Sequence, residues 1–158
     1  MSSPKTLVRT AVSRETDALS RLTMRSKAHW GYDATFLEAC RAELTVTPQM
    51  IAEGGVRVAE TNSVLQGIYR LTVSGRDATI ELFYIDPSTI GSGIGRQLWG
   101  DLVARAIEAG ATKLLIEADP HAEGFYERMG AVRTGSCPSG SIHGRMLPLL
   151  ELTLGDTP

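Results

Sequence analysis

Three glycines at alternate positions, Gly91, Gly93 and Gly95, are the residues of this sequence best suited to bind a ligand. They follow residues 79–85, a β-branched and aromatic segment that predicts a strand. Apolar residues at helical spacing come next, so the glycines mark the start of a helix. Without Cβ atoms there, free backbone N–H groups and the positive end of the helix dipole can approach an anion closely. A phosphate-bearing ligand fits this geometry, and the plainer alternative is a flexible turn.

Residue identities exclude two common nucleotide-binding motifs. A P-loop requires Gly-Lys-Ser/Thr, but Gly95 is followed by Arg96 and Gln97. The dinucleotide-binding fingerprint requires a third glycine, and Arg96 stands where that glycine should follow Gly93. The glycines therefore predict a phosphate site of another kind.

A second pattern lies downstream, where residues 119–131 read Asp-Pro-His-Ala-Glu-Gly-Phe-Tyr-Glu-Arg-Met-Gly-Ala. Together the two patterns resemble the GNAT superfamily of N-acetyltransferases. The family's loop pattern is Gln/Arg-x-x-Gly-x-Gly/Ala, and its later motif is Asn-x-x-Ala-x-x-Phe/Leu-Tyr-x-x-x-Gly-Phe. The two glycines of the loop pattern match Gly93 and Gly95. In the later motif the matching residues are Ala122, Phe125, Tyr126 and Gly130. The departures are Ile90, Asp119 and Ala131, and the opening 7–11 also resembles the family's first strand.

The resemblance implies that acetyl-CoA is the cofactor and CoA the product. The glycine loop would hold the pyrophosphate, and the backbone of the preceding strand would pair with the pantetheine arm as an added strand. Arg96 would add positive charge, although a surface arginine is an equally good interpretation. The residues assigned to this site are Phe83, Tyr84, Ile85, Ile90, Gly91, Ser92, Gly93, Ile94, Gly95, Arg96, Asp119, Ala122 and Phe125.

Tyr126 is the first candidate catalytic residue. In the family, the matching tyrosine lies beside the CoA sulfur and donates a proton or a hydrogen bond as the thiolate leaves. A thiol with a reference pKa of about 8.5 is a tolerable leaving group, so modest donation is sufficient. The alternative places Tyr126 in a core stripe with Ala122, Phe125 and Met129. Phe125 fits that core role better, so we predict that Tyr126 is catalytic.

Glu81 is the candidate general base, because it lies where histone-acetyltransferase-like members carry their catalytic glutamate. Strand alternation places Glu81 on one face with Phe83 and Ile85, and a carboxylate on an apolar face is suited to proton abstraction. Two alternatives remain open: a solvated strand residue beside Arg76 and Asp77, and loss of the amine proton through water.

The resemblance places the acceptor between the first two helices and beside the final strands. The residues assigned there are Lys27, His29, Trp30, Tyr32, His143 and Arg145, with Ser139 and Ser141 in the same segments. Lys27 and Arg145 could bind the carboxylate of an amino-acid-like amine, although each alone is also consistent with a solvated charge. The sequence lacks the strong acidic cluster expected for a polyamine acceptor. Nearby acidic residues nevertheless keep that alternative open, namely Asp33, Glu38 and Glu43.

Strands and helices alternate along the chain without a repeat or a long linker. Strands are expected at 7–11, 56–60, 64–73, 78–85, 113–118, 131–135 and 145–154, and helices at 15–26, 34–44 and 93–110. A further helix should begin with Asp119 as its cap and Pro120 at its first position, and end at Gly130. We therefore predict an α/β (α+β) fold with helices on both faces of a mixed, mostly antiparallel central sheet of about six to seven strands. One GNAT-like domain should cover residues 1–158.

Composition is that of an ordinary globular protein: 42% hydrophobic and 22% charged residues, with a formal net charge of −2 over 158 residues. This charge predicts no nucleic-acid partner, and no apolar run predicts a membrane segment or a signal peptide, so we expect a cytoplasmic location. Cys40 and Cys137 are isolated, which predicts neither a disulfide nor a metal site. Neither cysteine lies in the matched motifs, so no covalent acyl-enzyme is expected.

Together these observations predict an acetyl-CoA-dependent N-acetyltransferase. The acceptor would be a primary amine of a small molecule, and the acetyl group would move directly within a ternary complex. Two alternatives remain: a catalytically silent acyl-CoA-binding or regulatory module, and an acetyltransferase whose acceptor is a protein or another macromolecule. A homodimer is also left open.

Overall fold

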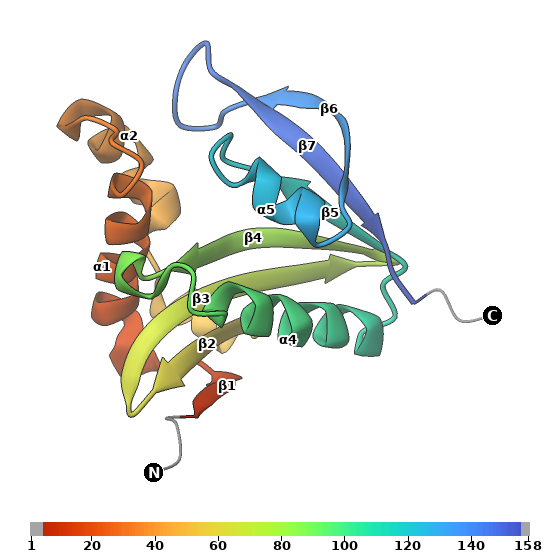
Figure 1. Cartoon of the computed structure of the whole chain (residues 1–158), viewed down its shortest axis with the longest axis horizontal. Helices are drawn as coiled ribbons and strands as arrows, with labels where there is room; N and C mark the ends of the chain where they lie inside the picture. Colours follow the sequence, from red (N-terminus) through yellow and green to blue (C-terminus); the bar gives the residue numbers. More distant parts are fainter. Residues whose placement is uncertain (1–4, 156–158) are drawn as a thin grey trace. The chain divides into compact units, whose positions relative to one another are not determined.

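The computed structural model describes residues 5–155 and contains a seven-stranded sheet with the order β1-β2-β3-β4-β5-β7-β6 (Figure 1). The strands are β1 (Thr6–Thr10), β2 (Val56–Thr61), β3 (Val64–Ser74), β4 (Asp77–Ile85), β5 (Lys113–Glu117), β6 (Val132–Pro138) and β7 (Met146–Thr153). The β4–β5 pair is parallel, whereas the β1–β2, β2–β3, β5–β7 and β6–β7 pairs are antiparallel. The predicted mixed, mostly antiparallel sheet is thus confirmed.

The helices are α1 (Thr16–Ala28), α2 (Ala34–Leu44), α3 (Pro48–Ala52), α4 (Ile94–Glu108) and α5 (Glu123–Arg128). Helix α2 begins where the side chain of Asp33 accepts a hydrogen bond from the Phe36 N–H group, which satisfies a backbone donor that the helix leaves unpaired. Helix α4 is followed by Gly110, whose φ of +88° suits a glycine at a helix C-terminus. Helix α3 was not predicted, because five residues are too few to display a helical period.

The predicted cap of α5 is wrong. Helix α5 begins at Glu123, and Asp119 instead stabilises a turn that precedes the helix. The Asp119 carboxylate accepts a hydrogen bond from the His121 N–H group at 2.8 Å, and its carbonyl accepts one from Ala122, also at 2.8 Å. An Asp-Pro pair starts turns as readily as it starts helices, so the sequence did not distinguish the two.

The chain divides into two compact units. The first unit comprises the described residues of 5–70 together with 82–102, and the second comprises 71–81 and 103–155.

In the first unit, helices cover both faces of the sheet. Leu19 and Leu22 of α1 belong to a buried cluster with Val58 and Ile68, which are paired across β2 and β3 and therefore share a face. The neighbouring Gly67 faces the other way, toward α4. A Cβ atom there would lie 2.6 Å from a methyl carbon of Leu98, so glycine is needed for the helix to approach this closely.

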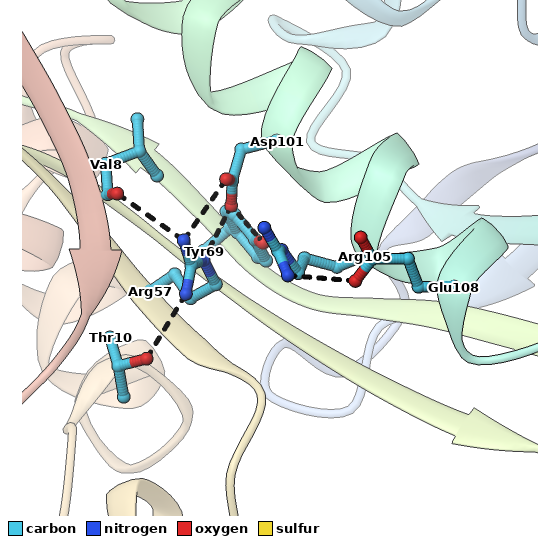
Figure 2. Close-up of polar contacts among 7 residues, drawn as sticks. All are labelled: Val8, Thr10, Arg57, Tyr69, Asp101, Arg105 and Glu108. Atoms are coloured by element: carbon cyan, nitrogen blue, oxygen red, sulfur yellow. Dashed lines mark hydrogen bonds and ion pairs between the residues drawn. The ribbon is translucent and has the colours of Figure 1, made fainter.

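A polar network holds α4 against the face of the sheet opposite α1 (Figure 2). One carboxylate oxygen of Asp101 in α4 accepts hydrogen bonds from Arg57 Nε at 2.7 Å and from the Tyr69 hydroxyl at 2.6 Å. Arg57 also donates to the Thr10 hydroxyl at 3.2 Å and to the Val8 carbonyl at 3.4 Å. Tyr69 is fully buried, so its hydrogen bond to Asp101 is largely shielded from water. The network joins α4 to β1, β2 and β3.

In the second unit, β5 contributes two buried side chains. Leu114 and Ile116 point to one face of β5, and both are buried, as is Leu150 of β7, which pairs with Ile116. Ala106 of α4 and Tyr126 of α5 are also buried in this unit. Within residues 5–155, no helix combines the length and the apolar character needed to cross a membrane.

Candidate functional site

The glycine turn follows β4 directly and leads into α4. After Ile85, a 3-10 turn over Pro87–Thr89 precedes the glycines. Gly91 and Gly93 have φ values of +85° and +92°, a backbone region that residues with a side chain rarely adopt. Gly95 lies in the first turn of α4 without such a φ. Two of the three glycines are thus favoured by backbone conformation, while Gly95 provides one position without a side chain in the first helical turn.

The start of α4 has the features of an anion-binding site. The Gln97 N–H group bonds to the Gly93 carbonyl at 3.1 Å, so the amides of residues 94–96 precede the helical hydrogen-bond ladder. A Cβ atom on Gly91 or Gly93 would meet nothing within 4 Å, which shows open space beside the turn. Helix α4 spans 15 residues, long enough for its dipole to contribute. These features fit a pyrophosphate.

The side chains assigned to the cofactor around this turn differ in exposure. Ile90 is 52% exposed, and Arg96 is exposed on the first turn of α4, which is compatible with both interpretations of this arginine. Phe83 and Tyr84 are half-buried, and the Phe83 ring meets Trp99 of α4 edge-on at 6.2 Å between centroids. The side chain of Phe83 therefore packs on the helix.

Asp86 organises the turn and was missed in the sequence. Its carboxylate accepts hydrogen bonds from Arg25 of α1 at 2.7 Å and from the N–H group of Ser88 at 3.0 Å. Burial opposes ionisation of Asp86, but the bonds from Arg25 and Ser88 outweigh it and lower its pKa below the ordinary value. The Asp86-Pro87 pair was the available signal, since Asp before Pro marks a turn. Contact with Arg25, which is distant in sequence, left no local signal.

The end of α1 and the segment that follows it, assigned to the acceptor, contain a buried cation and several aromatic rings. Lys27 is only 6% exposed, and its ammonium lies 5.4 Å from the centroid of the Tyr32 ring. Tyr32 stacks on Phe36 at 4.0 Å, and His29 meets Trp30 edge-on at 5.0 Å. This burial excludes the alternative in which Lys27 is a solvated surface charge.

Tyr126 is buried in the second unit, whereas Phe125 is half-buried. The expectation that Phe125 fits the core better is therefore wrong. The predicted stripe began at Ala122, but α5 begins only at Glu123, so the helical period was counted from a residue outside the helix. Burial, followed by the nearby charge of Asp119, raises the pKa of Tyr126 above its ordinary value. The phenol is therefore neutral at physiological pH.

Arg145 is engaged by an acidic residue of its own unit. Its guanidinium lies 3.5 Å from the Asp119 carboxylate, and both side chains are largely shielded from water. The loop that carries Arg145 is closed by a bond from the Ser139 N–H group to the Arg145 carbonyl at 2.7 Å. His143, on the same loop, is exposed. A substrate carboxylate would have to share Arg145 with Asp119.

Glu81 is exposed, and its carboxylate accepts a hydrogen bond from the Thr72 hydroxyl at 2.8 Å. The buried positions of β4 nearby are Ala78, Ile80 and Leu82, so Glu81 lies on the opposite side of the strand from them. Glu81 therefore shares a face with Phe83, which packs on Trp99, but its own side chain is exposed to solvent.

The cysteines lack the features of nucleophiles. The Cys137 thiol donates a hydrogen bond to Glu117 at 3.0 Å, and this bond, with burial, raises the pKa of the thiol to about 11. A thiol with this pKa holds its proton at neutral pH, and it is the thiolate that attacks. Cys40 is buried in α2. Among residues 5–155, no three His, Cys, Asp or Glu side chains are grouped to hold a metal ion.

The fold is shared with solved acetyltransferase structures, and three illustrate this. PaiA N-acetyltransferase from Thermoplasma acidophilum, in complex with coenzyme A, is 15% identical with a TM-score of 0.79, covering 94% of this chain and 99% of that one. YncA, a putative acetyltransferase from Salmonella typhimurium with acetyl-CoA, is 19% identical with a TM-score of 0.70, covering 98% and 96%. The ribosomal-protein-S18-alanine N-acetyltransferase from Escherichia coli is 15% identical with a TM-score of 0.71, covering 98% and 97%.

At these identities the structural likeness establishes the fold. No curated protein sequence matches this chain significantly. The model of the acetyltransferase (GNAT) domain family matches residues 15–139, which is most of the chain. The protein therefore belongs to the GNAT family of acetyltransferases.

Proposed function

We propose that this GNAT acetyltransferase transfers the acetyl group of acetyl-CoA to a primary amine of a small molecule, directly and within a ternary complex. The observation that carries the proposal is the turn between β4 and α4, in which Gly91 and Gly93 adopt backbone conformations that favour glycine. Open space lies beside this turn. Coenzyme A in PaiA and acetyl-CoA in YncA, two proteins of the same fold, support the choice of cofactor.

In this proposal, acetyl-CoA supplies an activated thioester, and the first unit of the protein binds its phosphates. The backbone amides of residues 94–96 and the turn at Gly91 and Gly93 bind the pyrophosphate, assisted by the α4 dipole. The backbone of residues 83–85 pairs with the pantetheine arm in the manner of a strand added to a sheet. The side chain of Phe83 packs on Trp99, which leaves its backbone as the group available to a ligand.

Tyr126 is proposed to donate a proton or a hydrogen bond to the departing thiolate. Its phenol is neutral because burial and Asp119 raise its pKa. A thiol has a reference pKa of about 8.5, so a hydrogen bond from a neutral phenol is enough to assist its departure. The protonated state of Cys137 supports direct transfer rather than an acyl-enzyme.

For deprotonation of the amine, we retain Glu81 and water as the two proposed routes. Glu81 is exposed and hydrogen-bonded to Thr72, which favours water as the immediate acceptor of the proton. Many members of the superfamily are expected to use such a route, so the exposure of Glu81 is compatible with activity.

The acceptor is proposed to be amino-acid-like, with a carboxylate or another anionic group near its amine. The buried Lys27 and the rings of Tyr32 and Trp30 support this class, because a shielded cation beside aromatic surface suits a small anionic ligand. Arg145 would have to interact with such a ligand while remaining paired with Asp119.

A matched panel of amines tests the proposal. Free CoA release would be measured with acetyl-CoA and amino acids, amines of equal size without a carboxylate, polyamines, and short peptides with free N-termini. We expect turnover with carboxylate-bearing small amines, reduced at least tenfold by Lys27→Met. Turnover with peptides alone would support a macromolecular acceptor, and CoA binding without any acceptor-dependent turnover would support a silent acyl-CoA-binding module.

A further inference from the structure

We propose that Asp86 is a positioning residue for the phosphate-binding turn, and that Arg25 of α1 holds its carboxylate in place. The inference rests on the proposed acetyl-CoA site. Asp86 does not contact the ligand in this account; it acts through the backbone that it orders.

Asp86 uses its backbone and both carboxylate oxygens at once. Its N–H group donates to the Gln66 carbonyl of β3 at 2.8 Å, which fixes the point where the chain leaves the sheet. One carboxylate oxygen accepts from the N–H group of Ser88 at 3.0 Å and from its hydroxyl at 2.8 Å. The other accepts from Arg25 at 2.7 Å. The Asp86 carbonyl accepts from the N–H group and the hydroxyl of Thr89, both at 2.9 Å.

These bonds continue as a chain of turns to the start of α4. The Thr89 carbonyl that follows accepts the N–H group of Ser92 at 3.0 Å. The next residue, Gly93, supplies the carbonyl to which the Gln97 N–H group bonds at 3.1 Å. Three linked steps therefore run from Asp86 to the first turn of α4, so displacement of Asp86 would change the directions of the amides at residues 94–96.

The two partners of the carboxylate should contribute unequally. The Arg25 side chain is 51% exposed, whereas that of Asp86 is 16% exposed. An ion pair with one exposed partner is weak, because water competes for the guanidinium. The N–H group and the hydroxyl of Ser88 donate to the Asp86 carboxylate from within the same turn, and hydrogen bonds to a charged acceptor are stronger than neutral ones. We therefore expect Asp86 substitutions to act more strongly than Arg25 substitutions.

Arg25 also ties the turn to the segment proposed for the acceptor. It lies in the last turn of α1, two residues before the buried Lys27. Order imposed on the turn by bound CoA would thus extend to the end of α1. Hydrogen exchange at residues 26–32, compared with and without CoA, measures this effect and does not require the acceptor to be known.

Calorimetric titration of CoA tests the inference with four variants. We expect Asp86→Ala to weaken CoA binding by roughly ten- to a hundredfold, and Asp86→Asn by less, because the amide oxygen can still accept from Ser88. Arg25→Gln should weaken it by no more than about fivefold, as for an exposed ion pair. The control is Arg41→Gln, which removes an equally short, exposed ion pair with Glu38 in α2 and should leave CoA affinity unchanged.

A second readout separates positioning from general stability. Amide exchange over residues 87–96 should be faster in Asp86→Asn at unchanged global stability, and with an accepted amine the KM for acetyl-CoA should rise while kcat stays the same. If wild type fails to bind CoA, the proposed function itself is wrong. If wild type binds and both Asp86→Asn and Arg25→Gln match it in affinity and exchange, only the positioning role is overturned. These two milder variants decide the matter even if Asp86→Ala does not fold.

Discussion

At the scale of single residues, Tyr126 combines burial with a proton that is hard to remove. Burial and the charge of Asp119 both disfavour the phenolate, so the pKa is higher in the folded protein than in the unfolded chain. A group with a raised pKa stays protonated through the physiological range and loses its proton only above its ordinary value near 10. The hydroxyl is therefore available as a donor at every pH where the enzyme would normally work.

Replacing Tyr126 with phenylalanine tests this role. Because only the hydroxyl is lost, we expect packing to survive while turnover falls by roughly ten- to a thousandfold, the usual range for a general acid. The affinity for acetyl-CoA should change little. Steady-state rates at saturating acetyl-CoA provide the measurement, and an unchanged turnover number would assign Tyr126 to the core alone.

Glu81 requires a different experiment, because its exposed position makes water a competitor for the amine proton. An alkylammonium has a reference pKa near 10.4, so at pH 7 only about one molecule in a thousand or so is neutral. If Glu81 is the base, Glu81→Gln should slow the reaction at neutral pH and recover toward pH 9 to 10, with acetyl-CoA affinity unaffected. Thr72→Val, which removes the hydrogen bond to Glu81 but keeps the carboxylate, is the matched control. Parallel pH–rate profiles for wild type and Glu81→Gln would exclude Glu81 and leave water or another group as the base.

At the scale of elements, the placement of α4 decides where its N-terminal amides lie. Gly67 allows the helix to approach β3, since any Cβ atom there would collide with Leu98. The Asp101 network then fixes the helix to β2 and β3 through Arg57 and Tyr69 (Figure 2). Close packing and a charged network thus act on the same helix that begins at the glycine turn.

The bond from Tyr69 to Asp101 should be a large contributor to stability. Tyr69→Phe removes a 2.6 Å hydrogen bond to a carboxylate and leaves the ring in place, so we expect a loss of about 1.5–3 kcal/mol in the free energy of unfolding. Urea denaturation of the variant and the wild type measures the difference. Arg41→Gln, which breaks an exposed pair in α2, should cost less than about 0.5 kcal/mol. Equal effects of the two substitutions would show that the Asp101 network is not protected from water.

Elements with a long, regular pattern could be predicted from the sequence. The predicted helix 34–44 matches α2, and the seven predicted strand ranges lie within a few residues of the observed strands. The helix after Asp119 was placed too early, since the residues of a turn and of a helix start are the same there. Tyr126 rather than Phe125 is the buried aromatic residue, and a helix of only six residues shows too little periodicity to distinguish two adjacent aromatic side chains.

At the scale of the molecule, each compact unit carries a different part of the proposed chemistry. The first carries the glycine turn and the aromatic segment around Lys27, and the second carries Glu81 and Tyr126. The glycine turn could be predicted because its requirement is local, a backbone that excludes side chains. The contacts of Asp86 with Arg25 and of Asp119 with Arg145 could not, because each joins residues far apart in sequence.

Calorimetric titration with acetyl-CoA tests the central claim most directly, that the glycine turn binds the phosphates of this cofactor. We expect a dissociation constant in the micromolar range, about −8 kcal/mol, for the wild type. Gly93→Val should abolish binding, because a β-branched residue is strained at a φ of +92° and its side chain would fill the open space beside the turn. The control is Gly100→Ala, at a solvent-exposed position in the middle of α4, which should bind acetyl-CoA normally. Absence of heat and of any thermal shift with acetyl-CoA or CoA, or normal binding by a folded Gly93→Val protein, would contradict the account.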